Sequence, residues 1–271
     1  MGLDSLEKLN PMLPPQIIYE DSDILVLNKP FGLITHPKNK NDTSESVVSW
    51  LTNNYPGIEN IGEPFIASGT PMPRAGVVHR LDRDTSGLIL VAKNNESFLF
   101  LKSLFQTRKI QKYYQALVAG QLKKPQGIID SPLGRIGLKW TTKLNGPDAK
   151  SIEDPRFGNH ALHGPNRDKK MIDKKEAVTE YRTLKKFKKF TLLEVMPKTG
   201  RTHQIRVHLN SIGYPVCGDV IYGFKKNLKP PGLTRLFLHA YKLEFITPQG
   251  KALTIEVDLP AELSDVLENL S

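Results

Sequence analysis

Cysteine is nearly absent from this chain of 271 residues, in which Cys217 is the single example. One cysteine excludes an intramolecular disulfide and any zinc site that is built on cysteine ligands. Apolar runs of the ~20 residues that a membrane helix needs are missing too. The first residues are charged and lack the apolar segment of a signal peptide. We therefore expect a cytoplasmic protein that makes no membrane contact.

Several common catalytic motifs are also missing. Ser86 lacks the G-x-S-x-G turn of a hydrolase nucleophile, and His203 and His208 do not have the i, i+4 spacing of a helical zinc site. The chain has no G-x-x-x-x-G-K-[ST] loop and no strand–G-x-G-x-x-G–helix unit for a nucleotide cofactor. The sequence therefore predicts neither a metal nor a cofactor.

Positive charge, by contrast, is in excess. The chain has 38 Lys and Arg against 28 Asp and Glu, a formal charge of +10. Such an excess favours an anionic partner, most often nucleic acid, although a basic surface can serve solubility alone. The length allows one large domain or two small ones, and 39% hydrophobic content is typical of a soluble globular enzyme.

Hydrophobic patterning predicts more strands than helices. We expect an α+β fold with a largely antiparallel mixed β-sheet core, flanked by helices and loops. In residues 235–246, Tyr241, Leu243 and Phe245 alternate with Lys242 and Glu244, as in a half-buried strand. The expected strands cover 17–19, 24–27, 88–92, 113–118, 177–181, 190–196, 235–246 and 253–257, and the expected helices lie near 47–51, 95–105, 204–209 and 260–270.

Two stretches differ from the rest. Residues 1–15 look like a flexible leader, and residues 142–172 are polar and poor in apolar side chains. We expect the second stretch to be a long surface loop. The remaining residues, 16–271, then form one domain.

Three polar clusters stand at the ends of these elements. In the first, His79, Arg80, Asp82, Arg83 and Asp84 lie between two apolar runs. The second is Lys112-Tyr113-Tyr114, in which the two tyrosines face opposite sides of a strand. The third runs from Lys198 to Arg206, where a Thr-Gly turn leads into a helix. Each cluster alone could be a solvated ion-pair surface, but three together favour a functional site, because buried charge is costly unless it is paired or used.

The clusters resemble those of one known family, the RluA-type pseudouridine synthases. The likeness covers nearly the whole chain, from Asn28-Lys29-Pro30-Phe31-Gly32 to Leu238-His239-Ala240. Its most specific parts are His79-Arg80-Leu81-Asp82-x-x-Thr85-Ser86-Gly87-Leu88 and Thr199-Gly200-Arg201-Thr202-His203-Gln204-Ile205-Arg206-Val207-His208, which Gly218-Asp219 and Tyr222-Gly223 follow. The resemblance implies the pseudouridine synthase fold, with a catalytic cleft across the sheet, and conversion of uridine in RNA to pseudouridine without a metal or cofactor.

The resemblance also implies roles for individual residues. Asp82 matches the family's essential aspartate, and Arg201 matches the arginine that pairs with it. Tyr114 matches the tyrosine that packs on the target base, and Arg80 matches the residue that enters the RNA stack when the base leaves. The expected further RNA contacts are His79, Arg83, Lys112, His203 and Arg206.

Two features depart from the family pattern. Many members carry a small N-terminal RNA-binding domain, and we expect none here, because about 16 residues precede the first strand. The stretch 142–172 is longer than expected and contains Lys143, Lys150, Arg156, Arg167, Lys169 and Lys170. It is either an RNA contact or a tolerated surface insertion.

From the resemblance we expect a monomeric RNA pseudouridine synthase whose substrate is ribosomal RNA, with transfer RNA as the second candidate. Two alternatives remain open: a non-catalytic RNA-binding protein on the same fold, and a base-excising glycosidase that uses Asp82. The chemical route of the reaction stays open as well.

Overall fold

One large sheet organises the chain in a computed structural model that describes residues 13–136, 139–142, 172–223 and 229–270. Its strand order is β1-β2-β5-β13-β6-β12-β11-β7, and β14 pairs with β13. The pairings are antiparallel except for β5 with β13, which is parallel. The strands are β1 (Gln16–Glu20), β2 (Ile24–Lys29), β5 (Ser86–Ala92), β6 (Gln111–Ala119), β7 (Gln126–Asp130), β11 (Val178–Lys186), β12 (Phe190–Pro197), β13 (Leu238–Ile246) and β14 (Ala252–Glu256).

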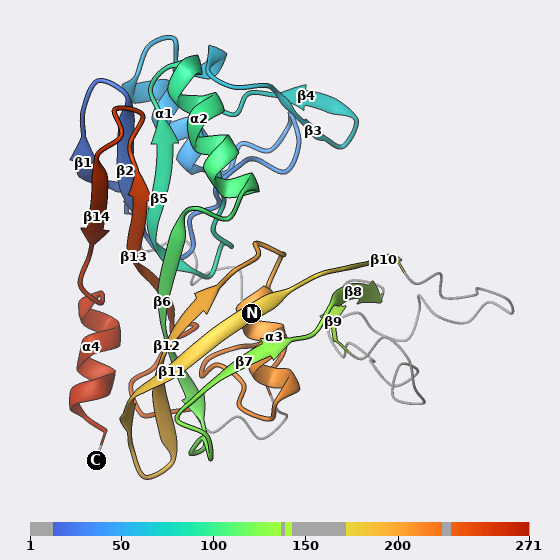
Figure 1. Cartoon of the computed structure of the whole chain (residues 1–271), viewed down its shortest axis with the longest axis vertical. Coiled ribbons are helices and arrows are strands. Elements are labelled where there is room, and N and C mark those ends of the chain that lie inside the picture. The colour runs from blue at the N-terminus through green and yellow to red at the C-terminus, as the bar shows by residue number, and fades with distance from the viewer. Residues whose placement is uncertain (1–12, 137–138, 143–171, 224–228, 271) are drawn as a thin grey trace, which may run out of the picture.

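Smaller elements surround this sheet. The hairpin of β3 and β4 projects from one end of the molecule, and three short strands form a separate sheet of order β10-β8-β9 (Figure 1). These elements are β3 (Phe65–Ala67), β4 (Thr70–Met72), β8 (Leu133–Ile136), β9 (Lys139–Thr141), β10 (Ile172–Lys175) and the 3-10 helix η2 (Ile58–Asn60). The mixed, largely antiparallel α+β architecture expected from the sequence is confirmed.

Two helices sandwich the N-terminal half of the sheet. Helix α1 (Val47–Asn54) begins after Ser46, which forms a capping box with Ser49. Helix α2 (Asn95–Gln106) begins after Asn94, whose side chain accepts from the Ser97 N–H. The two helices pack on opposite faces of β2 and β5, so that all seven residues of β5 are buried.

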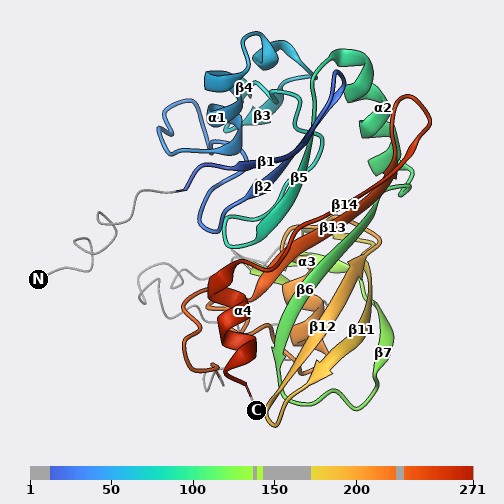
Figure 2. The same cartoon turned by 90° about the vertical axis from the view of Figure 1, so that its left-hand side faces the viewer.

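The C-terminal half is built in the same way. Helix α3 (Gln204–Ser211) packs on one face of β6 and β12, and α4 (Ala261–Glu268) packs on the other. Figure 2 shows α3 and α4 on either side of the strands at the lower end of the molecule. Among the described residues, no helix is long and apolar enough to cross a membrane.

The pairing of β13 with β6 contains a register shift between Ala240 and Lys242. As a result, Leu243 and Phe245 are buried, whereas the hydroxyl of Tyr241 donates to Glu194. The expectation that Tyr241 shares the buried face with Leu243 and Phe245 is therefore wrong. An extra residue in one strand reverses the alternation beyond it.

A short parallel contact joins the two halves of the sheet. Ser86 pairs with His239, and Gly87 pairs with Ala240. Gly87 has a φ of +115°, and a Cβ atom there would lie 2.2 Å from the Ala240 carbonyl oxygen. Only glycine permits this approach of β5 to β13, which explains the glycine of the Thr85-Ser86-Gly87 segment.

The expected leader and the expected loop at 142–172 lie almost entirely outside the described residues. Of the leader, residues 13–15 are described, and of the loop only residue 142 and residue 172 are.

Candidate active site

A cleft of about 470 Å³ lies where the three polar clusters meet. Its floor is β6, and its walls come from the end of α2, the segment before β5 and the turn that leads into α3. Six basic side chains line it, and Asp82 is the one acidic residue among its described lining residues. The basic side chains are Arg80, Arg108, Lys112, Lys198, Arg201 and Arg206.

The loop that carries Asp82 is fastened to the turn after β2. The buried Lys29 ammonium donates to the carbonyls of Pro30, Leu33 and Arg83 at 3.0, 2.7 and 3.3 Å. Burial and the nearby Arg235 lower the pKa of Lys29 to about 7, while Asp82 and Asp84 act in the opposite direction.

A second set of hydrogen bonds fixes Leu81, the residue before Asp82. Thr35 Oγ1 donates to the Leu81 carbonyl at 2.8 Å and accepts from the Leu81 N–H at 3.3 Å. The Thr85 N–H then donates to the Asp82 carbonyl at 3.1 Å, which closes a turn. The backbone on both sides of Asp82 is thereby fixed.

Arg235 anchors the strand that follows this loop. Its guanidinium is buried, donates to Ser86 Oγ at 2.6 Å and pairs with Glu262 of α4 at 2.9 Å. It also lies over the Phe31 ring at 4.5 Å. The start of β5 is therefore tied both to the turn after β2 and to α4.

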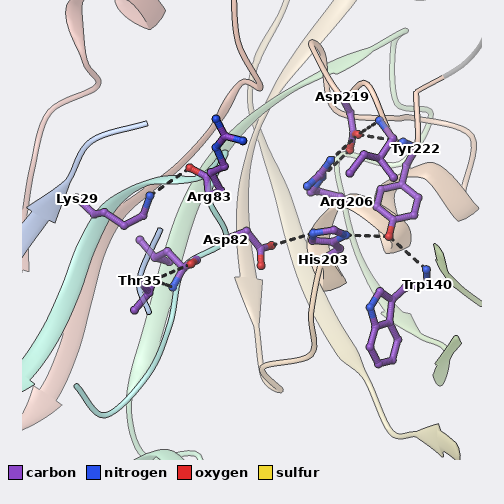
Figure 3. A network of polar contacts seen from close by, with 11 residues as sticks. Lys29, Thr35, Asp82, Arg83, Trp140, His203, Arg206, Asp219 and Tyr222 are labelled. Carbon is purple, nitrogen blue, oxygen red and sulfur yellow. Dashed lines mark hydrogen bonds and ion pairs between the residues drawn. The ribbon is translucent and has the colours of Figure 1, made fainter. Parts of the chain in front are cut away.

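Asp82 faces His203 across the cleft. Oδ2 of Asp82 lies 4.0 Å from Nε2 of His203, and the two side chains are 19% and 22% exposed (Figure 3). His203 has a left-handed backbone, with φ of 56°, which costs a non-glycine residue roughly 1–2 kcal/mol. Such strain is retained where the surrounding structure requires the side chain in one place.

Tyr114 and Lys112 enter the cleft from the same side of β6. Burial first, and Asp82 second, raise the pKa of Tyr114, so that its phenol stays protonated at neutral pH. Burial lowers the pKa of Lys112 to about 8, and its ammonium donates to the Thr199 carbonyl at 3.4 Å. Tyr113 faces the other side and donates to Glu244 at 2.8 Å, as strand alternation predicts.

Arg201 lines the cleft but does not pair with Asp82 in this structure. Its Nε donates to the Glu176 carbonyl at 3.0 Å. The turn itself is fixed by Gln204, whose Oε1 accepts from Thr199 Oγ1 at 2.7 Å and from the Arg201 N–H at 3.0 Å. The guanidinium thus lies on a rigid turn at the edge of the cleft.

Arg206 is placed differently from the expectation of an RNA contact. Its guanidinium is 2% exposed and makes two hydrogen bonds of 2.8 Å to the buried Asp219. It also lies over the Tyr222 ring at 5.3 Å. Burial acts to raise the pKa of Asp219, but hydrogen bonds from Arg206 and from backbone N–H groups hold it below its usual value. We therefore interpret Arg206 as a support of the site.

The remaining sequence candidates occupy distinct positions. Arg80 lines the cleft and is exposed. His79 lines it too, but its Nε2 accepts from the Leu90 N–H at 2.8 Å and its ring stacks on Phe105 at 4.7 Å. Burial lowers the pKa of His79 to about 3. Arg83 lies outside the cleft lining, where its Nε donates to the Gly32 carbonyl at 3.3 Å.

Several residues that complete the site had no specific role predicted from the sequence. Nδ1 of His203 lies 2.8 Å from the Tyr222 hydroxyl, which accepts from the Trp140 N–H at 3.3 Å (Figure 3). Tyr222 and Asp219 belong to motifs that carried the resemblance, so a signal for them existed. Nothing in the sequence pointed to the Trp140 backbone.

This geometry suits one kind of chemistry. A single carboxylate faces a basic, partly apolar cleft beside a protonated phenol, an arrangement that can hold an anionic substrate and act on an electrophilic carbon. In the described segments, no group of three or more His, Cys, Asp or Glu side chains is arranged to hold a metal ion.

Comparison with known proteins identifies the family. The family model described as RNA pseudouridylate synthase matches residues 23–211, more than half of the chain. The chain therefore belongs to the RNA pseudouridylate synthase family, and it is an isomerase that makes pseudouridine in RNA.

Individual relatives of the chain are also named as pseudouridine synthases. The chain is 38% identical to an uncharacterized RNA pseudouridine synthase of Aquifex aeolicus, over 94% of this chain and 72% of that protein. It is 36% identical to the ribosomal large subunit pseudouridine synthase D of Nitrosomonas europaea, over 94% of this chain and 65% of that protein. In both alignments the chain spans about two thirds to three quarters of the relative's length.

Solved structures support the fold. Human RNA Pseudouridylate Synthase Domain Containing 4 superposes with a TM-score of 0.66 at 24% identity, over 94% of this chain and 93% of that one. Human RNA Pseudouridylate Synthase Domain Containing 1 gives 0.63 at 23% identity, over 96% and 90%. At this identity the likeness concerns the fold alone.

Proposed function

We propose that this chain isomerises uridine in ribosomal RNA, with Asp82 as the residue that acts on the ribose. The observation that carries the proposal is the placement of Asp82 as the single described carboxylate in a cleft lined by six basic side chains. The relative from Nitrosomonas europaea, whose name specifies the large ribosomal subunit, supports ribosomal RNA over transfer RNA. We also propose that the protein acts as a monomer and in the cytoplasm, a reducing compartment that suits a chain whose one cysteine forms no disulfide.

The reaction breaks the bond between N1 of uracil and C1′ of ribose. The freed base turns, C5 bonds to C1′, the C5 proton leaves to solvent, and N1 gains a proton. Asp82 cannot reach C1′ of a stacked nucleotide, so the uridine first leaves the stack, which costs roughly a few kcal/mol. The exposed Arg80 guanidinium takes the place of the base in the stack.

Tyr114 and Arg201 complete the proposed machinery. The Tyr114 ring packs on the uracil, and its protonated phenol is placed to donate or relay a proton. Arg201 leaves the Glu176 carbonyl and pairs with Asp82 when RNA fills the cleft, because hydrogen bonds in an unliganded site are often looser than in the complex. Lys112 and Arg80 supply cationic contacts to the RNA backbone and bases.

Release of tritium from RNA that contains 5-tritiated uridine tests the assignment. We expect Asp82→Asn to release at least a thousandfold less tritium per unit time, since it removes the group that acts on C1′. Asp84→Asn is the matched control, because Asp84 belongs to the same loop but does not line the cleft. Equal release by wild type and Asp82→Asn contradicts the catalytic role of Asp82, and free uracil as the product identifies a glycosidase instead.

The RNA class needs a separate test. Pseudouridine positions are mapped in ribosomal and transfer RNA from cells with and without this protein. We expect positions to disappear from ribosomal RNA. Disappearance from transfer RNA alone would overturn the substrate assignment and leave the reaction unchanged.

A further inference from the structure

His203 occupies the space between Asp82 and a buried tyrosine. Its ring meets the Tyr222 ring edge-on, with centroids 5.5 Å apart, and its two nitrogens face different partners. Nδ1 lies 2.8 Å from the Tyr222 hydroxyl, and Nε2 lies 4.0 Å from Asp82 Oδ2 (Figure 3). The imidazole therefore connects the carboxylate to Tyr222.

The direction of the first hydrogen bond follows from the group behind Tyr222. The Trp140 backbone N–H, which can only donate, gives its hydrogen bond to the Tyr222 oxygen at 3.3 Å. Burial raises the pKa of Tyr222 to about 12, so the phenol keeps its proton at neutral pH. Within the described structure, Nδ1 of His203 is the acceptor beside that proton. Tyr222 thus donates to Nδ1, and Nδ1 carries no hydrogen.

This direction fixes the form of the imidazole. Burial lowers the pKa of His203, with Asp82 opposing the shift, and the ring is neutral at pH 7. A neutral imidazole with an unprotonated Nδ1 carries its hydrogen on Nε2, the nitrogen that faces Asp82. The backbone of β9 therefore sets, through Tyr222, which nitrogen of His203 is protonated.

We infer that His203 is a positioning residue that orients Asp82 through a neutral Nε2–H, in a tautomer that Tyr222 selects. Arg206 pairs with Asp219, and among the described basic side chains it is His203 whose contact with Asp82 Oδ2, at 4.0 Å, is recorded. A neutral donor orients the carboxylate without cancelling its negative charge. At 4.0 Å the contact is looser than a hydrogen bond, and exclusion of water by RNA tightens it.

The expected effect of His203 on the reaction rate rests on the proposed function, but the expected protonation of its two ring nitrogens does not. Long-range ¹⁵N–¹H correlation spectra of the free protein distinguish a pyridine-type ring nitrogen from a pyrrole-type one. For His203 we expect a pyridine-type Nδ1 and a pyrrole-type Nε2 at pH 7, and a mixture of tautomers in Tyr222→Phe. A pyrrole-type Nδ1 in the wild type overturns the inference, whether or not the protein makes pseudouridine.

Kinetics separate positioning from RNA contact. We expect His203→Ala to lower kcat about a hundredfold with KM changed less than threefold, since a small displacement of a reacting group costs about that much. His203→Gln retains an N–H donor and should recover at least a tenth of the wild-type kcat. Tyr222→Phe should lower kcat about five- to tenfold, the effect of one neutral hydrogen bond.

The controls make each outcome informative. Tyr214 packs on the core next to α3 and does not line the cleft. Tyr214→Phe removes its hydroxyl and should leave kcat and KM unchanged. Melting temperatures identify any variant that fails to fold. If every variant fails to fold, the ¹⁵N–¹H spectra of the wild-type protein still test which nitrogen of His203 is protonated. A raised KM with unchanged kcat in His203→Ala would show an RNA contact and refute the positioning role.

Discussion

The parallel contact between β5 and β13 depends on Gly87, and Gly87→Ala tests that dependence. An added Cβ would lie 2.2 Å from the Ala240 carbonyl oxygen and 2.6 Å from the Ala240 nitrogen, both backbone atoms that no rotamer change can move away. The φ of +115° adds a conformational cost for any residue with a side chain. Because Ala240 also pairs with Tyr114, a displaced β13 shifts the floor of the cleft.

The expected decrease in the free energy of unfolding of Gly87→Ala is the sum of these two costs. A left-handed conformation costs an L-residue about 1–2 kcal/mol. Overpacking against backbone costs about 1–3 kcal/mol more. The free energy of unfolding should therefore fall by about 2–5 kcal/mol, and a domain of this size loses about 2–4 °C in Tm per kcal/mol. We expect Tm to fall by roughly 4–20 °C.

Thermal unfolding followed by circular dichroism measures this effect, and Gly250→Ala is the matched control. Gly250 has a φ of +81°, but a Cβ there would meet nothing within 4 Å. Its substitution should lower Tm by roughly 2–8 °C, the conformational cost alone. Equal decreases for the two variants would refute the close approach at the β5–β13 contact.

Three further predictions concern single side chains. Tyr114→Phe keeps the ring that packs on uracil but loses the phenol, so kcat in the tritium assay should fall about a hundredfold with little change in KM; an unchanged kcat excludes proton transfer through Tyr114. Asp219→Asn leaves the buried Arg206 charge poorly paired and should lower the free energy of unfolding by about 3–5 kcal/mol at pH 7. The pKa of Asp219 is lower in the folded protein than in the unfolded chain, so this stabilisation is complete above the unfolded pKa and is lost as pH falls through the folded pKa. The difference in Tm between the wild type and Asp219→Asn should therefore become smaller in acid. Burial raises the pKa of Cys217 to about 12, and iodoacetamide should therefore label it only after unfolding, as mass spectrometry can show.

The sequence predicted the elements well where side-chain periodicity reports burial directly. The spacing of Phe98 and Leu101 indicated α2, and both residues are buried against the sheet. The alternation around Tyr241 failed because an inserted residue at the register shift leaves no mark in the sequence. Secondary structure that depends on pairing between distant strands is therefore the part that periodicity misses.

The functional site, too, has a part that was predicted from the sequence and a part that was not. The resemblance implied that Asp82, Tyr114 and Arg201 act in one site, and in the structure all three line the same cleft. The sequence could not decide which guanidinium of the Arg201–Arg206 segment is free, since that depends on Asp219, which lies 13 residues beyond Arg206. Nor did the sequence predict that Lys29 is fully buried beneath the Asp82 loop, where three carbonyls accept hydrogen bonds from its ammonium.

The tie between Ser86 and α4 has a consequence for protein synthesis. Arg235 and Glu262 are made long after Asp82, yet they anchor the start of the strand that follows it. A nascent chain that ends before them contains Asp82 and the Lys29 and Thr35 contacts of its loop, but it lacks the contacts that anchor the start of β5. The anchoring of the strand that follows Asp82 is therefore completed only after α4 has been synthesised.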